Sequence, residues 1–394
     1  MSMNKEIYLE GVKKFQSPLY IYDLDAANEE VERFRKNLGP KIDLCFAMKA
    51  NPFIVSYMSE RVSKIEVCSF GEFLICEKLQ IPPEKMLISG VLKETKDLPH
   101  ILAYCREKSI YTIESHEQFE FLGKWSSKND VSLRVYIRLT SGNQFGVDEQ
   151  DFLSMIEEKK QYPNLTIAGI HYFTGTQKRQ AKTIEKELKR IDDFIVRIKE
   201  ETGLEIENFE YGPGVGVPYF EGKDVPLFED EGLMELQQLV ADMKFKGSVT
   251  FEMGRALSAR CGVYITQVCD MKTNQDVHYC IVNGGMHQMN YDGQIKGMYH
   301  PQIEVLSDTH QASDKAWTVC GSLCTFNDVL TSDMVLGELS IGDYLVFKNA
   351  GAYSSMEGMA LFLSHELPGV VTFSKEKGFA EARKMQSTFQ LNTF

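Results

Sequence analysis

Short apolar runs rich in β-branched and aromatic residues recur roughly every 20 to 35 residues along the first two thirds of the chain. Longer stretches with the apolar spacing of amphipathic helices, such as 70–79 and 181–200, lie between them. The runs are 43–48, 65–69, 86–89, 110–113, 133–139, 166–172, 208–211 and 249–252. Strands that alternate with helices predict parallel pairing through right-handed crossovers. Eight such units favour a closed eight-stranded (β/α)8 barrel over an open sheet.

The pattern changes after Arg255. Four further apolar runs, at 261–269, 278–282, 316–319 and 344–347, follow one another without helices of comparable length between them. Such a pattern is typical of antiparallel β structure, and we expect the early strand 19–22, which falls outside the barrel count, to join it. The sequence therefore predicts a barrel domain at 27–260 and a mainly antiparallel β domain made of 1–26 and 261–394.

Composition narrows the function classes. A chain of 394 residues that is 43% hydrophobic can bury two cores, and 43 basic against 56 acidic residues give a net charge of −13. That charge repels phosphate backbones and anionic membranes, so neither nucleic acid nor membrane is an expected partner. The first residues lack the apolar core of a signal peptide, and no run of about 18 apolar residues occurs, so we expect a cytoplasmic protein.

The cysteines and histidines argue against a metal or disulfide framework. The nine cysteines include no CxxC pair, and the eight histidines show no HxH or HxxxH spacing near a carboxylate cluster. We therefore expect no bound metal.

Polar residues and glycines gather where the predicted barrel strands end, which is where barrel enzymes carry their chemistry. Lys49 ends the first apolar run, and burial there would leave an amine suited to imine formation with an aldehyde. The glycine-rich loop 212–216 and Arg255 follow the seventh and eighth strands and combine backbone N–H donors with a guanidinium, a good phosphate site. Alone, a lysine at a strand end or a tight glycine turn is the commoner reading of each feature. Together they suggest pyridoxal phosphate.

Seven stretches, in order between about residues 19 and 368, resemble the fold-type III pyridoxal-phosphate decarboxylases that act on ornithine, diaminopimelate, arginine and related amino acids. They are FAMKAN (46–51), EVCSFGE (66–72), GIHYFTGTQ (169–177), GPGVG (212–216), EMGR (252–255), GSLCTFND (321–328) and GAY (351–353). The resemblance implies a cofactor-carrying barrel, a C-terminal β domain and a head-to-tail homodimer with shared active sites.

The resemblance also implies residue roles. Lys49 would form the Schiff base with pyridoxal 5'-phosphate, and Glu252 would hold the proton on the pyridine nitrogen. Cys324 would reach the partner subunit's site and protonate the α carbon after carbon dioxide leaves. The residues implied to hold the phosphate are Thr176, Gly214, Gly254, Arg255 and Tyr353.

Several positions depart from the best-known members of that family. Phe173 stands where they have a histidine that stacks on the cofactor ring, and His171 lies two positions earlier on the same strand face. Thr325, a neutral residue, follows the motif cysteine where an acidic residue meets the distal end of an ornithine or diaminopimelate substrate.

The stretch 284–293 lacks the arginine of diaminopimelate enzymes, which argues against that substrate. Tyr291 and Asp292 match a Tyr-Asp pair used by ornithine enzymes, so Asp292 and Asp328 are candidate substrate contacts, although solvated loop carboxylates are the commoner reading.

The stretches HYFTGTQ, CTFND and FLSHELP are more similar to decarboxylases of siderophore and antibiotic pathways. We therefore expect a modified amino acid or an aminoacyl group on a carrier protein as substrate, with a free basic amino acid (ornithine, lysine or diaminopimelate) as the alternative. An amino-acid racemase shares the barrel and the cofactor but places an arginine at the pyridine nitrogen. Glu252 at that position argues against a racemase. An inactive regulatory homologue tends to lose the lysine, phosphate ligands or cysteine, all of which are present here.

Overall fold

The computed structural model describes residues 3–307 and 311–394, and its chain divides into two compact units. The barrel unit comprises Val31–Val217 and Val225–Leu257; the β unit comprises Met1–Glu30, Pro218–Asp224 and Ser258–Phe394. The segment Pro218–Asp224, which the sequence placed in the barrel, belongs to the β unit. Each unit is described separately below.

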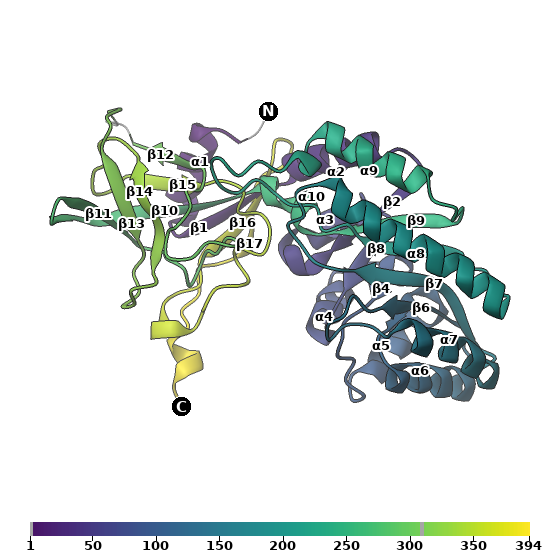
Figure 1. Cartoon of the computed structure of the whole chain (residues 1–394). Helices are drawn as coiled ribbons and strands as arrows, with labels where there is room; N and C mark the ends of the chain where they lie inside the picture. Colours follow the sequence, from purple (N-terminus) through teal and green to yellow (C-terminus); the bar gives the residue numbers. More distant parts are fainter. Residues whose placement is uncertain (1–2, 308–310) are drawn as a thin grey trace. The chain divides into compact units, whose positions relative to one another are not determined.

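The barrel unit contains eight parallel strands that close in the order β2 to β9, as the spacing of the apolar runs predicts (Figure 1). The strands are β2 (Ile42–Ala47), β3 (Lys64–Val67), β4 (Met86–Ile88), β5 (Ile110–Ile113), β6 (Leu133–Leu139), β7 (Leu165–Phe173), β8 (Asn208–Gly212) and β9 (Ser248–Met253). The helices are α2 (Leu24–Leu38, shared with the β unit), α3 (Val55–Ser59), α4 (Phe70–Lys78), α5 (Leu98–Cys105), α6 (His116–Asn129), α7 (Glu149–Glu158), α8 (Ala181–Thr202), α9 (Asp230–Ala241) and α10 (Arg255–Ser258).

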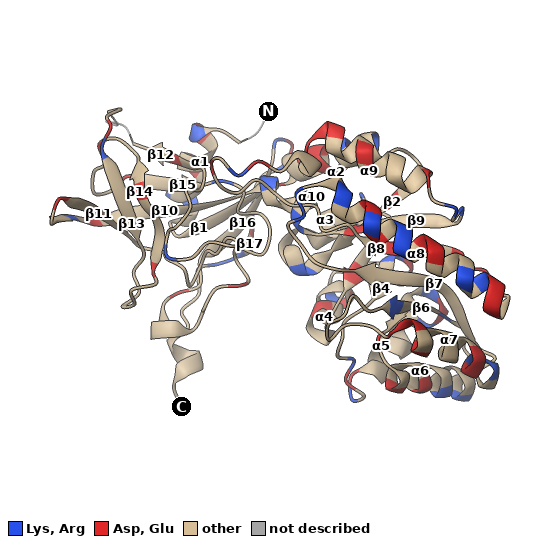
Figure 2. Ribbon diagram, viewed as in Figure 1, with Lys and Arg blue, Asp and Glu red and all other residues tan. Residues whose placement is uncertain are grey.

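Local sequence signals explain where the helices begin. Ser69, Ser115 and Asp148 are the N-cap residues of α4, α6 and α7, and each side chain accepts a hydrogen bond from the backbone N–H three residues later. Figure 2 shows ribbon segments of acidic and basic residues alternating along α8, whose apolar residues, such as Ile184, Leu188 and Ile191, are buried.

An ion pair crosses the barrel interior from β3 to β8. Lys64 and Glu210 are joined through Nζ and Oε2, with 13% and 0% of their side chains exposed. Burial raises the pKa of Glu210 to about 7, although the neighbouring Lys64 acts to lower it. Cys45 is paired in register with Lys64 on one side and Glu252 on the other, so this pair lies in the strand layer just below the end of β9.

The β unit is built on a nine-stranded mixed sheet in the order β14-β13-β11-β10-β1-β16-β17, with β15 pairing both β10 and β12. The strands are β1 (Leu19–Asp23), β10 (Gly262–Asn274), β11 (Val277–Val282), β12 (Ile303–Leu306), β13 (Ala316–Cys320), β14 (Val329–Val335), β15 (Tyr344–Phe347), β16 (Gly369–Ser374) and β17 (Gly378–Arg383). Most pairs are antiparallel; β1 with β16 and β11 with β13 are parallel. The early strand joins this sheet between β10 and β16, as predicted.

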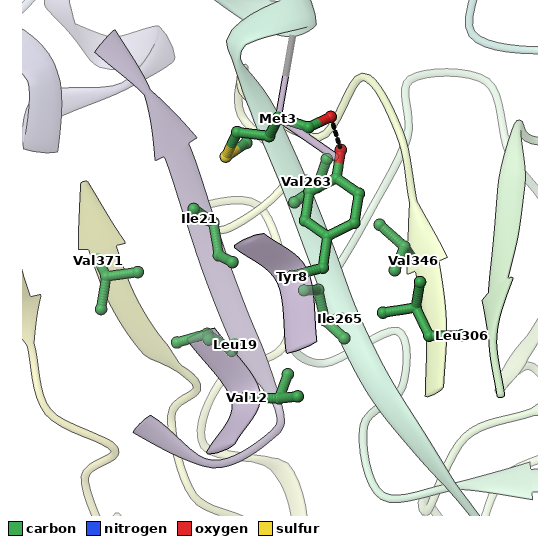
Figure 3. Close-up of a cluster of buried hydrophobic side chains, with 10 residues drawn as sticks. All are labelled: Met3, Tyr8, Val12, Leu19, Ile21, Val263, Ile265, Leu306, Val346 and Val371. Atoms are coloured by element: carbon green, nitrogen blue, oxygen red, sulfur yellow. Dashed lines mark hydrogen bonds between the residues drawn. The ribbon is translucent and has the colours of Figure 1, made fainter. Parts of the chain in front are cut away.

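One face of this sheet is covered by α1 (Lys5–Phe15), a helix that the sequence reading missed. Tyr8 and Val12 of α1 pack against Leu19 and Ile21 of β1 in a buried cluster (Figure 3). The Tyr8 hydroxyl donates a hydrogen bond to the carbonyl of Met3 across 3.2 Å, so its polar end is satisfied within the core.

Across residues 3–307 and 311–394, no helix combines the length and apolarity that crossing a membrane requires.

Candidate active site

Lys49 lies in a single 3-10 turn, Met48–Ala50, directly after β2. Its Nζ is 2.5 Å from Oε2 of Glu66 and 4.0 Å from Oε1 of Glu252. The sequence predicts a desolvated amine at this position. The Lys49 side chain is instead 41% exposed. A buried carboxylate at that distance instead pairs with Lys49 as an ammonium ion.

Glu66 and Cys68, which the sequence reading did not select, complete the surroundings of Lys49. Glu66 is 2% exposed on β3, and its Oε1 accepts the thiol of Cys68 at 3.0 Å. The Cys68 sulfur in turn accepts a hydrogen bond from Lys49 across 3.4 Å. Burial, and next the Glu66 carboxylate, raise the pKa of Cys68 well above its ordinary value, so the thiol keeps its proton. A glutamate between two buried residues of a short strand is the sequence signal that could have identified Glu66.

Glu252, at the end of β9, lies between Lys49 and His171. Nε2 of His171 is 3.0 Å from Oε2 of Glu252, but the two groups are not aligned as a hydrogen bond. Burial, and next the charge of Arg138, lower the pKa of His171 to about 3, so the imidazole is neutral at physiological pH. Within the described part of the chain, Oε2 of Glu252 has no hydrogen-bond donor, which leaves a buried carboxylate oxygen available to an incoming N–H group.

A second buried ion pair lies at the ends of β5 and β6. Nη1 of Arg138 is 3.2 Å from both carboxylate oxygens of Glu114, with 9% and 1% of the side chains exposed. The guanidinium also stacks over Phe145 at 4.6 Å. An arginine inside the buried strand LRVYIRL is the sequence signal for this residue, and the sequence reading missed it.

The loops after β7 and β8 form a cradle with Arg255. Nε of Arg255 donates to the hydroxyl of Thr176 at 3.3 Å, so the two predicted phosphate ligands meet. Gly214 has φ of +64°, and a Cβ at that position would lie 2.0 Å from the carbonyl oxygen of Gly175. Only glycine fits there, and the backbone is thus free to approach a ligand closely.

Phe173 lies at the base of the same cradle. A Cβ added to Gly212 would meet the Phe173 ring at 2.5 Å, so the ring packs directly on that glycine's backbone. The half-buried ring therefore lies beside the loop expected to hold the phosphate, a place suited to stacking on a flat ligand.

Cys324, Thr325 and Asp328 lie together in the β unit, in the loop between β13 and β14. Cys324 is exposed, while Asp328 is 3% exposed and accepts backbone N–H groups from Met286 and Leu323, each at 2.7 Å. These bonds join the stretches 284–293 and 321–328. They give Asp328 a structural task, and its role in substrate binding stays a prediction.

The remaining predicted residues are also in the β unit. Tyr291 is 3% exposed, and its hydroxyl donates to the backbone carbonyl of Lys348. Asp292 is partly exposed beside it. Tyr353 has φ of +63°, a conformation that is strained for a residue with a side chain and is found preferentially at functional sites.

Comparison with known proteins agrees with this geometry. Residues 24–259 match the family model "Pyridoxal-dependent decarboxylase, pyridoxal binding domain", and the chain belongs to that family. It is a pyridoxal-phosphate-dependent amino-acid decarboxylase.

Its relatives divide by substrate. The chain is 28% identical over 373 residues to the diaminopimelate decarboxylase of Aquifex aeolicus (strain VF5), covering 88% of this chain and 86% of the relative. It is 27% identical over 403 residues to the L-glutamyl-[BtrI acyl-carrier protein] decarboxylase of Niallia circulans, covering 95% and 92%. It is 25% identical over 397 residues to the 2-[(L-alanin-3-ylcarbamoyl)methyl]-2-hydroxybutanedioate decarboxylase of Staphylococcus aureus (strain NCTC 8325 / PS 47), covering 94% and 98%.

The barrel residues fit the cofactor. The unpartnered oxygen of Glu252 suits a pyridine N–H, the cradle of Thr176, Gly214 and Arg255 suits a phosphate, and Lys49 supplies a primary amine for an aldehyde. When bound, pyridoxal phosphate supplies the electron sink that receives the electrons of the departing carboxylate.

Proposed function

We propose that this decarboxylase acts on an amino acid whose side chain is joined to a larger group, as an amide or as an aminoacyl group on a carrier protein. Two relatives are named for such substrates. The alternative is a free basic amino acid, which the diaminopimelate relative supports.

The observation that carries the choice is the environment of Asp328. Both carboxylate oxygens accept backbone N–H groups, and the Tyr291 hydroxyl donates to a backbone carbonyl. Because the Asp328 carboxylate and the Tyr291 hydroxyl are already hydrogen-bonded to the backbone, they are poorly suited to recognising the distal ammonium of ornithine or lysine. Thr325 adds no charge, and the stretch 284–293 contains no arginine for a distal carboxylate.

The barrel residues then take defined roles. Nζ of Lys49 would bind the cofactor's aldehyde carbon, and Glu66, 2.5 Å away, would take up and return the proton of that amine. Glu252 would hold the ring N–H, Phe173 would support the ring face, and the cradle with Gly254 and Arg255 would hold the phosphate. These contacts orient the substrate's α-carboxylate for loss, and orientation is the protein's main contribution.

Cys324 is proposed to return a proton to the α carbon in the partner subunit's site of a homodimer, and Tyr353 would help to hold the phosphate. An exposed thiol in a tight loop is accessible enough for this role. The mixed-variant test combines Lys49→Ala and Cys324→Ala proteins. Recovery of activity on mixing supports a shared site, while no recovery after verified subunit exchange contradicts it.

A screen of carbon dioxide release tests the substrate. It compares ornithine, lysine, diaminopimelate and free glutamate with amide-linked amino acids and carrier-bound aminoacyl substrates. The proposal expects release from a linked substrate at a kcat/KM at least about tenfold above every free amino acid, a margin of about 1.4 kcal/mol in transition-state binding. Faster release from a free basic amino acid would overturn the proposal, and the Lys49→Ala protein serves as the inactive control.

A further inference from the structure

The geometry points to Glu187, a residue of α8, as the positioning residue for the cofactor's phosphate group. It does not touch the cradle itself; instead it ties together the two loops that form it. The inference rests on the proposed phosphate site of Thr176, Gly214 and Arg255, and it is independent of which substrate is used.

The Glu187 carboxylate receives three side-chain hydrogen bonds. Oε1 accepts the hydroxyl of Thr174 at 2.7 Å; Oε2 accepts Nζ of Lys178 at 2.7 Å and the hydroxyl of Tyr211 at 2.6 Å. The side chains of Lys178 and Glu187 are only 9% and 12% exposed. Short hydrogen bonds to a buried carboxylate are among the stronger ones in proteins.

The three donors flank the cradle. Thr174 and Lys178 lie two residues before and two residues after Thr176, and Tyr211 lies three residues before Gly214. One carboxylate on α8 therefore fixes both sides of the loop after β7 and the start of the loop after β8.

The main chain of Lys178 joins the two loops directly. Its N–H donates to the carbonyl of Gly214, and its carbonyl accepts the N–H of Gly216, both at 2.9 Å. The side-chain amide oxygen of Gln177 accepts the N–H of Val217 at 2.8 Å. When Glu187 fixes the Lys178 side chain, it fixes these inter-loop bonds with it.

The pairing also decides which cation serves the phosphate. Burial lowers the pKa of Lys178, while Glu187 acts to raise it, so the ammonium is stabilised chiefly by this one carboxylate. The Lys178 charge is thereby neutralised within the network, and Arg255 is left as the cation of the cradle. Without Glu187, the buried Lys178 ammonium would lack its counter-charge, and the loop would have to move to expose it to water.

The test compares two ligands that differ only in the phosphate. Dissociation constants for pyridoxal phosphate and for pyridoxal are measured by absorbance titration on the full chain. Variants are Glu187→Gln, the milder Thr174→Val, Arg255→Met as the reference for phosphate loss, and Glu185→Gln as an exposed control on the same helix. Circular dichroism and thermal unfolding verify that each variant is folded.

We expect Glu187→Gln to weaken the binding of pyridoxal phosphate by about tenfold or more, by analogy with other residues that orient ligand-binding groups. The affinity for pyridoxal should change by less than about twofold. The quantity compared is the ratio of the affinity for pyridoxal phosphate to the affinity for pyridoxal. Thr174→Val should lower this ratio less than Glu187→Gln does, and Glu185→Gln should leave it unchanged. A ratio unchanged in both Glu187→Gln and Thr174→Val overturns the role of Glu187, as does equal weakening of both ligands. If Arg255→Met also keeps the ratio, the phosphate site itself is misplaced and the inference fails with it.

Discussion

Lys49 and Glu66 form an ion pair with 2.5 Å between Nζ and Oε2, while Oε1 of Glu252 lies 4.0 Å from the same nitrogen. The carboxylate beside the lysine is therefore a different one from the carboxylate assigned to the cofactor ring. In the proposed function, Glu66 would accept the proton of the amine, and Glu252 would bind the ring nitrogen.

Replacing Glu66 should impair chemistry more than cofactor binding. Glu66→Gln keeps the size of the side chain but removes the group that accepts the proton of Lys49, and general acid–base groups contribute on the order of 10²-fold or more. We expect kcat, measured by carbon dioxide release, to fall by at least about that factor, with the affinity for pyridoxal phosphate changed much less. Glu60→Gln, on an exposed glutamate, is the control; a kcat within about threefold of wild type in Glu66→Gln contradicts the role.

Breaking the Arg138–Glu114 pair should destabilise the barrel. Glu114→Gln leaves a guanidinium that is 9% exposed without its counter-charge, and loss of one partner of a buried pair costs about 3–5 kcal/mol. Urea unfolding measures the change. The double variant Glu114→Gln/Arg138→Met should be less destabilised than the sum of the single variants, whereas strict additivity would show that the two side chains act independently.

His171 should make the fold sensitive to acid. Because its pKa is about 3 in the folded chain and near 6.5 when unfolded, the unfolded chain binds more protons between those values. The free energy of unfolding therefore falls as the pH drops from about 6.5 towards 3. His171→Gln should flatten this fall.

The experiment compares unfolding curves of wild type and His171→Gln at pH 7, 6, 5 and 4, because the carboxylates titrate in both proteins and cancel in the difference. Parallel curves for wild type and His171→Gln would refute the assignment.

Gly214→Ala should damage the phosphate cradle. The new Cβ would lie 2.0 Å from the carbonyl oxygen of Gly175 and would sit at a φ of +64°, which together require the loop to move. We expect weaker binding of pyridoxal phosphate by about tenfold or more, measured by absorbance titration. Gly142→Ala has φ of +94° but nothing within 4 Å of the new Cβ, so it separates backbone strain from the clash.

The architecture could be predicted from the sequence because the barrel strands are buried apolar runs, and these runs alternate with stretches that have the apolar spacing of amphipathic helices. The run 110–113 became β5 without change, and 70–79 became α4. The helix α1 was missed because its mean composition is polar and only Tyr8, Gly11 and Val12 are buried.

The site was predictable in part. Lys49, Glu252, Thr176 and Arg255 belong to motifs, and the structure brings Thr176 to Arg255 and Lys49 to within 4.0 Å of Glu252. Residues that act through a neighbour, such as Glu187, gave no signal, because a glutamate on an amphipathic helix looks like any solvated charge. Only the folded chain shows which helix residue lies beneath which loop.

The pair of Lys64 and Glu210 has a consequence for how the barrel closes. The two residues come from strands that are not neighbours, so they meet only after β9 and β2 have been inserted between β3 and β8 with the correct stagger. A barrel closed one residue out of register would turn one of these side chains outward and leave the other charge buried alone, at a cost of several kcal/mol. The pair thus destabilises barrels that close in the wrong register. Replacing both residues by apolar ones should preserve stability, while closure becomes slower or less specific in its register.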